Sequence, residues 1–504
     1  MKQNTYKRIM SFAWFAILLA LIPFLIKKAV PDTDTFFLAA TGRYIVENGV
    51  VPTINPFVIH EGFSIVIQQW GFDVMIYQLY NNFGNHGLFV YVLIAYTAML
   101  VLLYKYIGLF TKNAWTRALV MLISGGIFLP FATARPTSFT ILSILSLLYC
   151  VEQYTRTEKI KYLIPLPIIS LIQINMHSSI WPMMFVLIVP YIFPHNVYSK
   201  AELFPAIKQW FKKYRWLLLT MLLMIMMGLI NPNGLNGILY VFKSYGNVAS
   251  KCGIQELAPP MMTQSMGIIC IVSIITLTVF VTINGKRIKD GLPALYNEIT
   301  RFYMAAGTII LACMHLRNSW YLIIGVMPMI AMMLDKLPAP PITNKEQSNA
   351  KRLVKVVATF IIPCLLTVLL CYATPYAQLT GGDTEFAPRE AAKYLNTLDK
   401  KDIKLYTEFN NGAFMEWEGY QVYFDARPEL FSIEINQKED VLTEYIELQD
   451  GTLDYGEFLN KYNFTHLIVT NKTMQMYLKY SSDYKTIVDG NGYILFERVP
   501  TSTE

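Results

Sequence analysis

The sequence predicts a mainly α-helical bundle that crosses a membrane many times and ends in a small extracytoplasmic α/β domain. Of its 504 residues, 54% are hydrophobic and 15% are charged, whereas soluble domains carry about 25% charged residues. Apolar runs near the roughly 20 residues that cross a bilayer recur through residues 1–376. From residue 377 onward the runs shorten to strand length. A soluble enzyme and a disordered chain are both excluded, because disorder requires low hydrophobicity and high charge.

The transmembrane part should contain about eleven spans by the length criterion. Their predicted starts lie near Arg8, Gly87, Ala118, Pro136, Tyr162, Ser178, Trp216, Met261, Phe302, Ser319 and Leu353. The first run has the basic start of a signal peptide, but it is about as long as a full span and has no small-residue cleavage site. We therefore interpret it as an uncleaved first helix.

Basic residues predict the orientation of the spans. If the N-terminus lies inside, the inner loops hold the basic clusters, as cytoplasmic loops usually do. These clusters lie within 105–117, 156–161, 200–215, 286–289 and 336–352. The pattern predicts a multi-pass plasma-membrane protein with a cytoplasmic N-terminus and, for an odd number of spans, an extracytoplasmic domain at 377–504. The net charge of +7 follows from the same loops, so no nucleic-acid partner is expected.

Residues 377–504 alternate between short apolar runs and helical spacing. Strands are predicted at 403–409, 421–425, 466–470 and 493–499, and helices at 389–398, 441–448 and 455–462. Pro388 suits the first turn of the first of these helices. Asp425 and Arg427 are predicted to form an ion pair that holds a turn. The domain could cover the functional site or bind an acceptor, and the sequence does not choose between these roles.

The first outer loop, residues 28–85, is unusually long and rich in polar residues. It holds Asp32, Asp34 and Trp70, and its segments 36–45 and 71–80 have amphipathic helical spacing. Long loops in compact proteins usually carry function, so we expect this loop to fold on the membrane surface. The structural alternative is that Asp32 and Asp34 only cap a helix that begins at Thr35.

Every later outer connection also presents polar side chains at the same membrane face. These are Arg135, Asn175, His177, Asn231, Asn233, Glu256, His315, Arg317 and Asn318. An ionisable group at the end of a span is costly unless it is paired or hydrated, so it is a functional candidate. Taken singly, the arginines could reach lipid phosphates, His177 could satisfy a turn and Glu256 could be solvated. Their shared side favours one extracytoplasmic pocket.

Acids and arginines in one outward pocket suit sugar transfer from a lipid phosphate. A carboxylate can deprotonate an acceptor hydroxyl, and arginine binds phosphate through charge-assisted hydrogen bonds. Nucleotide sugars are scarce outside the plasma membrane, so the expected partners are a lipid-linked sugar donor, a lipid-linked or cell-surface glycan acceptor and membrane lipids. Asp34 and Asp32 are the catalytic candidates. The substrate-binding candidates are Arg135, His177, Asn231, Glu256, Arg317, Asn318 and Trp70.

Residues 34–45 read DTFFLAATGRYI and are followed by Asn55-Pro56-Phe57 and Gln69-Trp70. These motifs resemble the first outer loop of GT-C-type membrane glycosyltransferases, and more narrowly a bacterial branch of mostly uncharacterised members. The resemblance continues through 135–136, 175–178, 231–234, Glu256, 317–318, 411–414 and 424–429. It implies a GT-C fold, a catalytic acid that maps onto Asp34 with Asp32 second, and a polyprenyl-phosphate sugar as donor.

The chain departs from this branch at a position that bears on metal binding. Gln69 replaces the acid that the branch has before Trp70, which removes a second carboxylate. A divalent cation is therefore possible but not favoured, and it would need Asp32, Asp34 and Glu256. No other cofactor is expected, and the 6 cysteines contain no CxxC pair that would hold a metal.

Two other functions fit parts of the same pattern. A transporter or flippase of lipid-linked sugars should show polar groups near mid-membrane or broken helices in paired halves. Here the ionisable groups lie at the ends of spans on one side. A catalytically inactive membrane scaffold of the same fold would leave the long polar first loop without a role. The pattern thus favours an enzyme, a hexosyl or pentosyl transferase.

Overall fold

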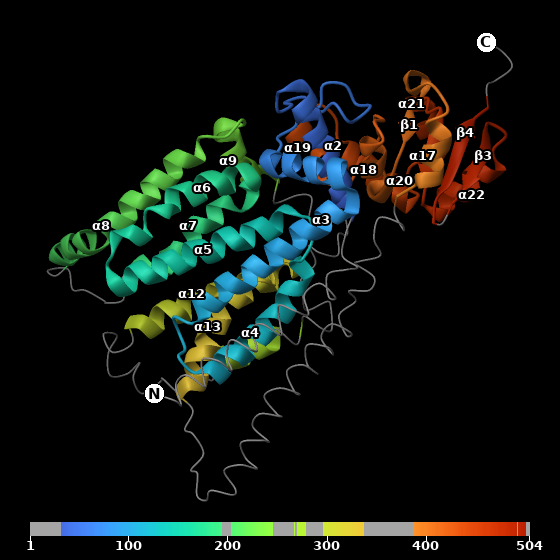
Figure 1. The fold of residues 1–504 in the computed structure, drawn as a ribbon. Helices are drawn as coiled ribbons and strands as arrows, with labels where there is room; N and C mark the ends of the chain where they lie inside the picture. The colour runs from blue at the N-terminus through green and yellow to red at the C-terminus, as the bar shows by residue number, and fades with distance from the viewer. Residues whose placement is uncertain are drawn as a thin grey trace, which may run out of the picture.

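The computed structural model describes residues 32–193, 203–244, 267, 270–278, 296–336, 387–490 and 492–499. The predicted spans near Arg8 and Leu353, most of the span near Met261, and the candidate Glu256 lie outside these residues. Within the described residues, the chain folds into a bundle of long helices with a small sheet beyond one end of it (Figure 1).

The long helices lie side by side along the bundle (Figure 1). In chain order they are α3 (Trp70–Ile107), α4 (Ala114–Phe128), α5 (Pro136–Thr157), α6 (Pro165–Met176), α7 (Trp181–Ile192), α8 (Leu203–Gly228), α12 (Tyr296–Met314) and α13 (Tyr321–Lys336). Helix α5 begins at the predicted Pro136, because proline fits the first helical position. Two further helices, α2 (Thr33–Asn48) and α9 (Gly234–Ser244), lie at the end that faces the sheet (Figure 1).

Helix length and composition identify membrane-crossing segments only in part. Of the described helices, Trp70–Ile107 is long and apolar enough to cross a membrane by itself. Shorter apolar helices are Thr116–Phe131, Ile160–Met176, Ser178–Ile192, Ile299–Met314 and Tyr321–Asp335. The total number of spans stays a prediction.

Helix α3 joins the surface segment predicted at 71–80 to the span predicted from Gly87. The two parts meet at Gly84, whose backbone is non-helical with φ 56° and ψ −144°. Glycine adopts this positive φ without the steric cost that a Cβ atom would add. The helical run therefore bends where the outer loop ends and the bundle begins.

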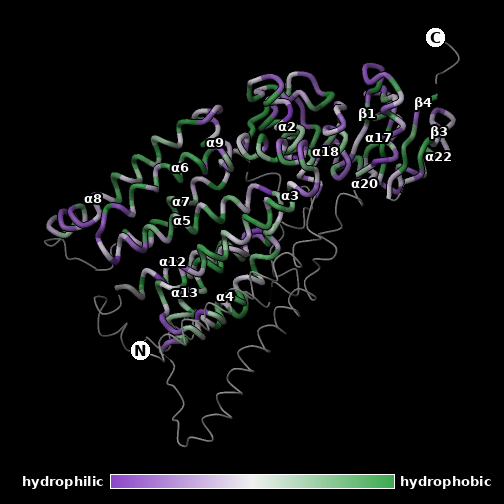
Figure 2. The backbone as a smooth tube through the Cα atoms, viewed as in Figure 1, coloured by the Kyte–Doolittle hydropathy of each residue, from purple (hydrophilic) through white to green (hydrophobic). Residues whose placement is uncertain are grey.

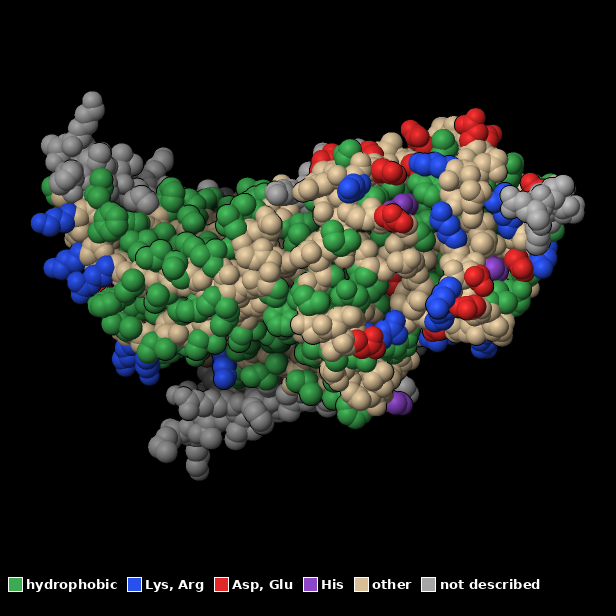
Figure 3. Space-filling model, turned by 90° about the horizontal axis from the view of Figure 1, so that it is seen from above, with side chains coloured by type: hydrophobic (Ala, Val, Ile, Leu, Met, Phe, Trp, Pro, Cys, Tyr) green, Lys and Arg blue, Asp and Glu red, His purple; other side chains and the backbone are tan. Residues whose placement is uncertain are grey.

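Polar and apolar residues are segregated along the bundle. Figure 2 shows hydrophobic residues through the middle of its helices and more hydrophilic residues toward their ends. In Figure 3 the bundle surface is mostly hydrophobic, and basic side chains gather at the end away from the sheet. The first half of α8, which holds Lys208, Lys212, Lys213 and Arg215, reaches that end of the bundle (Figure 1). A broad apolar belt with a basic far end is the surface expected of a membrane protein.

Residues 387–499, which we call the C-terminal unit, contain the described sheet. Its strands are β1 (Leu405–Tyr406), β2 (His466–Val469), β3 (Tyr484–Asp489) and β4 (Ile494–Arg498), in the order β1-β2-β4-β3. Strands β1 and β2 are parallel and the other two pairs are antiparallel. The helices are α17 (Arg389–Leu395), α18 (Phe409–Trp417), α19 (Ile433–Asn436), α20 (Val441–Asp450), α21 (Tyr455–Tyr462) and α22 (Lys472–Tyr480).

Most predicted elements of the C-terminal unit are confirmed, but the strand predicted at 421–425 is wrong. There Val422 makes only isolated bridges, in parallel with Leu405 on one side and Val58 on the other. The chain then turns, because the Asp425 carboxylate accepts a hydrogen bond of 2.6 Å from the Arg427 amide. Through the Val58 bridge, the first outer loop extends the β1 edge of the sheet.

Candidate functional site

The first outer loop places two acids at the start of helix α2. Asp32 is the N-cap, and its Oδ1 accepts hydrogen bonds from the Thr35 amide at 3.1 Å and the Thr35 hydroxyl at 2.9 Å. The Thr35 hydroxyl accepts in turn from the Asp32 amide at 3.2 Å. This capping box stabilises the first turn. The capping alternative is therefore confirmed for Asp32, while Asp34 lies inside the first turn.

Arg135 brings helix α5 into contact with both acids. It is the N-cap residue of α5, and its Nε donates to Asp32 Oδ2 at 2.6 Å. Its Nη1 lies 3.2 Å from Asp34 Oδ2. Burial alone would raise the pKa of Asp32, but the Arg135 charge and the hydrogen bonds from Arg135 and Thr35 lower it overall. Three sequence-predicted residues thus form one ion-paired group, with Asp32 as a stable anion.

His177 belongs to a second group of polar side chains, also near the start of helix α5. Its Nδ1 lies 2.7 Å from the hydroxyl of Thr140, on the second turn of α5. Gln173 donates to that hydroxyl at 3.0 Å and to the His177 carbonyl at 2.9 Å. Burial and the positive charge of Arg317 lower the pKa of His177 to about 3. The imidazole is therefore neutral near pH 7, and it can accept or donate a hydrogen bond but cannot supply a positive charge for phosphate.

Arg317 acts through its charge on both the bundle and the C-terminal unit. It lies in the short turn Leu316–Asn318 between α12 and α13. Its charge acts on His177 and also on Glu429, which follows Pro428 in the C-terminal unit. Burial and the neighbouring Asp425 raise the pKa of Glu429, whereas Arg427 and Arg317 lower it, with a net rise. Glu429 is not among the sequence-predicted site residues, although it closes the segment 424–429 that carries part of the family resemblance.

The predicted amide and indole side chains make hydrogen bonds to nearby backbone carbonyl groups and to one another. Trp70 Nε1 donates to Asn175 Oδ1 at 2.7 Å, and Asn175 Nδ2 donates to the Ile230 carbonyl at 2.9 Å. Asn231 Nδ2 donates to the carbonyls of Gly228 and Gly234 at 2.8 and 3.0 Å. Asn318 Nδ2 donates to the Leu311 carbonyl at 3.1 Å. These contacts hold turns together, and the substrate-binding role of Trp70, Asn231 and Asn318 stays a prediction.

The predicted ionisable residues that the structure describes thus fall into two groups that α5 connects. Asp32, Asp34 and Arg135 lie at its start. His177 lies beside its second turn through Thr140 and feels the charge of Arg317. That both groups line one pocket stays a prediction. Among the described residues, which exclude Glu256, no group of three or more His, Cys, Asp or Glu is placed to hold a metal ion.

Comparisons with known proteins identify the fold. No family model and no curated protein matches the sequence. The structure is similar to ArnT from Cupriavidus metallidurans in the apo state, with a TM-score of 0.56, 12% identity and coverage of 97% of this chain and 98% of that chain. The same protein bound to undecaprenyl phosphate gives a TM-score of 0.54 at 10% identity, with the same coverage.

An archaeal protein shares this likeness. The apo oligosaccharyltransferase of Archaeoglobus fulgidus gives a TM-score of 0.56 at 11% identity, covering 90% of this chain and 69% of that chain. The chain therefore has a GT-C-type glycosyltransferase fold, which is a membrane fold, as the motifs of the first outer loop predicted. At such identities the likeness concerns the fold, so function has to be argued from the site.

Proposed function

We propose that the chain is a membrane glycosyltransferase that moves a hexose or pentose from a polyprenyl-phosphate donor to a lipid-linked or cell-surface glycan. The observation that carries the proposal is the ion-paired group of Asp32, Asp34 and Arg135 on a GT-C-type bundle. One of the similar proteins, ArnT, was solved with undecaprenyl phosphate bound, and this is the carrier lipid class that we propose for the donor.

We also infer how the chain lies in the membrane. The N-terminus is cytoplasmic, about eleven spans follow, and residues 377–504 form an extracytoplasmic α/β domain. Two features support this arrangement: the basic side chains gather at the end of the bundle away from the sheet, as cytoplasmic ends do, and the candidate acids lie beside the C-terminal unit. The reaction then takes place on the outer face, where a lipid-linked donor is needed.

The proposed chemistry assigns the role of general base to Asp34. The acceptor hydroxyl oxygen attacks the anomeric carbon, its proton passes to the Asp34 carboxylate, and the bond from that carbon to the phosphate oxygen breaks. The polyprenyl phosphate leaves with its negative charge, which Arg135 or Arg317 stabilises. Both oxygens of Asp32 already accept hydrogen bonds, from Thr35 and from Arg135, so Asp32 orients the arginine.

The test is transfer by the purified full chain in lipid nanodiscs, with radiolabelled polyprenyl-phosphate hexoses and pentoses as donors. Asp34→Asn should lower turnover by about 100-fold or more, in the range that a general base contributes, while the melting temperature stays unchanged. The matched control is Asp454→Asn, the same chemical change at the exposed N-cap of α21, where asparagine caps equally well. Full activity of Asp34→Asn would refute the assignment, and absence of transfer from every donor by the wild type would refute the enzyme.

A further inference from the structure

The C-terminal unit and the first outer loop share backbone hydrogen bonds. The Val422 amide donates to the Phe57 carbonyl at 2.9 Å, and the Ile59 amide donates to the Val422 carbonyl at 3.0 Å. The ring Nε2 of His60 lies 2.9 Å from the Tyr423 carbonyl. Adding a segment to a sheet edge satisfies backbone groups of both partners. The two regions therefore fold as one body, although more than three hundred residues separate them in sequence.

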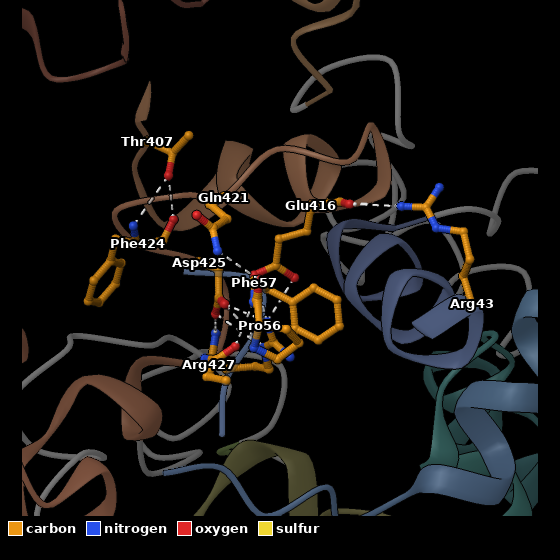
Figure 4. Close-up of polar contacts among 10 residues, drawn as sticks. Arg43, Pro56, Phe57, Thr407, Glu416, Gln421, Phe424, Asp425 and Arg427 are labelled. Atoms are coloured by element: carbon orange, nitrogen blue, oxygen red, sulfur yellow. Dashed lines mark hydrogen bonds and ion pairs between the residues drawn. The ribbon is translucent and has the colours of Figure 1, made fainter. Parts of the chain in front are cut away.

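Helix α18 of this unit packs along helix α2. The rings of Phe36 and Phe414 meet edge to face with their centroids 5.0 Å apart. Arg43 donates to the Glu416 carbonyl at 3.2 Å (Figure 4) and lies 4.8 Å from the centre of the Trp417 ring. The helix that begins with Asp32 and Asp34 is thus held along its length by the C-terminal unit.

Arg427 lies at the centre of this contact. Its guanidinium donates to Glu416 at 2.6 and 2.8 Å and to Asp425 at 2.6 Å (Figure 4), and its side chain is 8% exposed. The same group lies 4.9 Å from the centre of the Phe37 ring of α2 and 5.6 Å from that of Phe57. One buried cation therefore joins α18, the turn at 425–427, the first outer loop and α2.

A buried acid of α3 lies within the field of the same cation. Asp73 is 1% exposed, and neither of its carboxylate oxygens has a hydrogen-bond donor among the described residues. Burial raises the pKa of Asp73 well above its usual range, and the Arg427 charge opposes that rise only in part. Asp73 lies against Gly42, since a Cβ atom on that glycine would come within 2.1 Å of the Asp73 carbonyl oxygen. The helices α2 and α3 therefore cross in close contact beside this buried acid.

We propose that Arg427 is a positioning residue for the proposed transfer reaction, because it holds the Phe37 face of α2 and so sets where Asp34 stands relative to Arg135. Phe37 lies one helical turn after Asp34, so both side chains project from the same face. A shift of about 1 Å in a reacting group can cost about 100-fold in rate. The C-terminal unit is then part of the scaffold of the site, and this reactivity argument rests on the proposed function.

The experiment compares Arg427→Lys with the wild-type chain in nanodiscs. Lysine keeps the charge but lacks the planar fork that binds two carboxylates and stacks on a ring. Hydrogen exchange of peptides within Thr33–Asn48 should rise about tenfold, while peptides of α20 and α21 exchange as in the wild type. In the transfer assay kcat should fall about tenfold or more with KM for the donor changed by less than about threefold, because only the placement of the base is altered.

Two further variants keep the test decisive. Phe37→Leu loosens the same contact from the α2 side and should give the same split between kcat and KM, even if Arg427→Lys does not fold. Arg498→Lys, whose guanidinium donates to exposed Asn463 in the same unit, should leave both readouts unchanged. Unchanged α2 exchange in Arg427→Lys and Phe37→Leu would overturn the proposal, and so would faster exchange with wild-type kcat. A wild type without transfer activity would refute the proposed function alone, because the exchange readout needs no substrate.

Discussion

Loss of the Glu152 carboxylate should destabilise the bundle far more than loss of its exposed partner, Arg156. Glu152 of α5 is 5% exposed and accepts hydrogen bonds from two arginines. Arg156 contacts it at 2.7 Å and is 42% exposed, whereas Arg301 of α12 is 5% exposed. Arg301 also donates to the Tyr191 hydroxyl of α7 at 3.0 Å. One buried pair thus ties three helices together.

The burial of each partner sets the expected magnitude. Removing one member of a buried ion pair leaves an uncompensated charge and costs about 3–5 kcal/mol. An exposed pair spaced four residues apart on a helix contributes about 0.3–0.5 kcal/mol. Arg301→Met and Glu152→Gln should therefore each lower the free energy of unfolding by about 3–5 kcal/mol, and Arg156→Met by less than about 1 kcal/mol.

Unfolding of the purified chain in micelles, followed by tryptophan fluorescence, measures these differences. The double variant Glu152→Gln with Arg301→Met removes both charges. Its loss of unfolding free energy should therefore be smaller than the sum of the two single losses by about 2 kcal/mol or more. Additive losses, or an Arg301→Met variant as stable as Arg156→Met, would show that the buried pair does not hold α5 against α12.

Three other changes test separate parts of the structure. Asp32→Ala should speed hydrogen exchange in the first turn of α2 about 5- to 30-fold through loss of about 1–2 kcal/mol of capping, while Asp32→Asn keeps the cap. Burial lowers the pKa of His177 from 6.5 to about 3, so stability should fall as pH drops through that window. His177→Gln should flatten the fall by up to about 1.4 kcal/mol per pH unit in thermal melts. Gly42→Ala, whose Cβ would meet the Asp73 carbonyl at 2.1 Å, should cost about 1–3 kcal/mol, whereas Gly307→Ala, with open space, should be nearly neutral in the same melts.

Much of the helical fold could be predicted from the sequence because its signals are local. An apolar run of span length, or an Arg135-Pro136 pair ahead of one, specifies a helix start without knowledge of distant residues. The strand predicted at 421–425 failed because the chain turns at Asp425 and Arg427 directly after the isolated bridges of Val422. Strand β3 was missed because it is an exposed edge strand without a clear alternation of buried residues.

The sequence predicted the site only through the membrane side on which each connection lies. Placing every outer connection at one membrane face was enough to group Asp34 with Arg135, and His177 with Arg317. It could not find Glu429 or the contact of Arg427 with Phe37. Those depend on how the C-terminal unit docks onto the first outer loop, and no periodic pattern in either segment encodes that docking.

The choice between the two acids shows what tertiary contacts add. From the residues alone, Asp32 and Asp34 are two acids ahead of one helix, and only the family resemblance ranks Asp34 first. In the structure, Asp32 caps α2 through one oxygen and binds Arg135 through the other, and these interactions lower its pKa. A carboxylate with a lowered pKa is a weaker base, and a base needs an oxygen that can reach the acceptor proton. Asp34 lies inside the first turn of α2, and its Oδ2 lies 3.2 Å from Arg135 Nη1. Because Asp32 already uses both oxygens, we keep Asp34 as the proposed base and Asp32 as the residue that fixes the arginine.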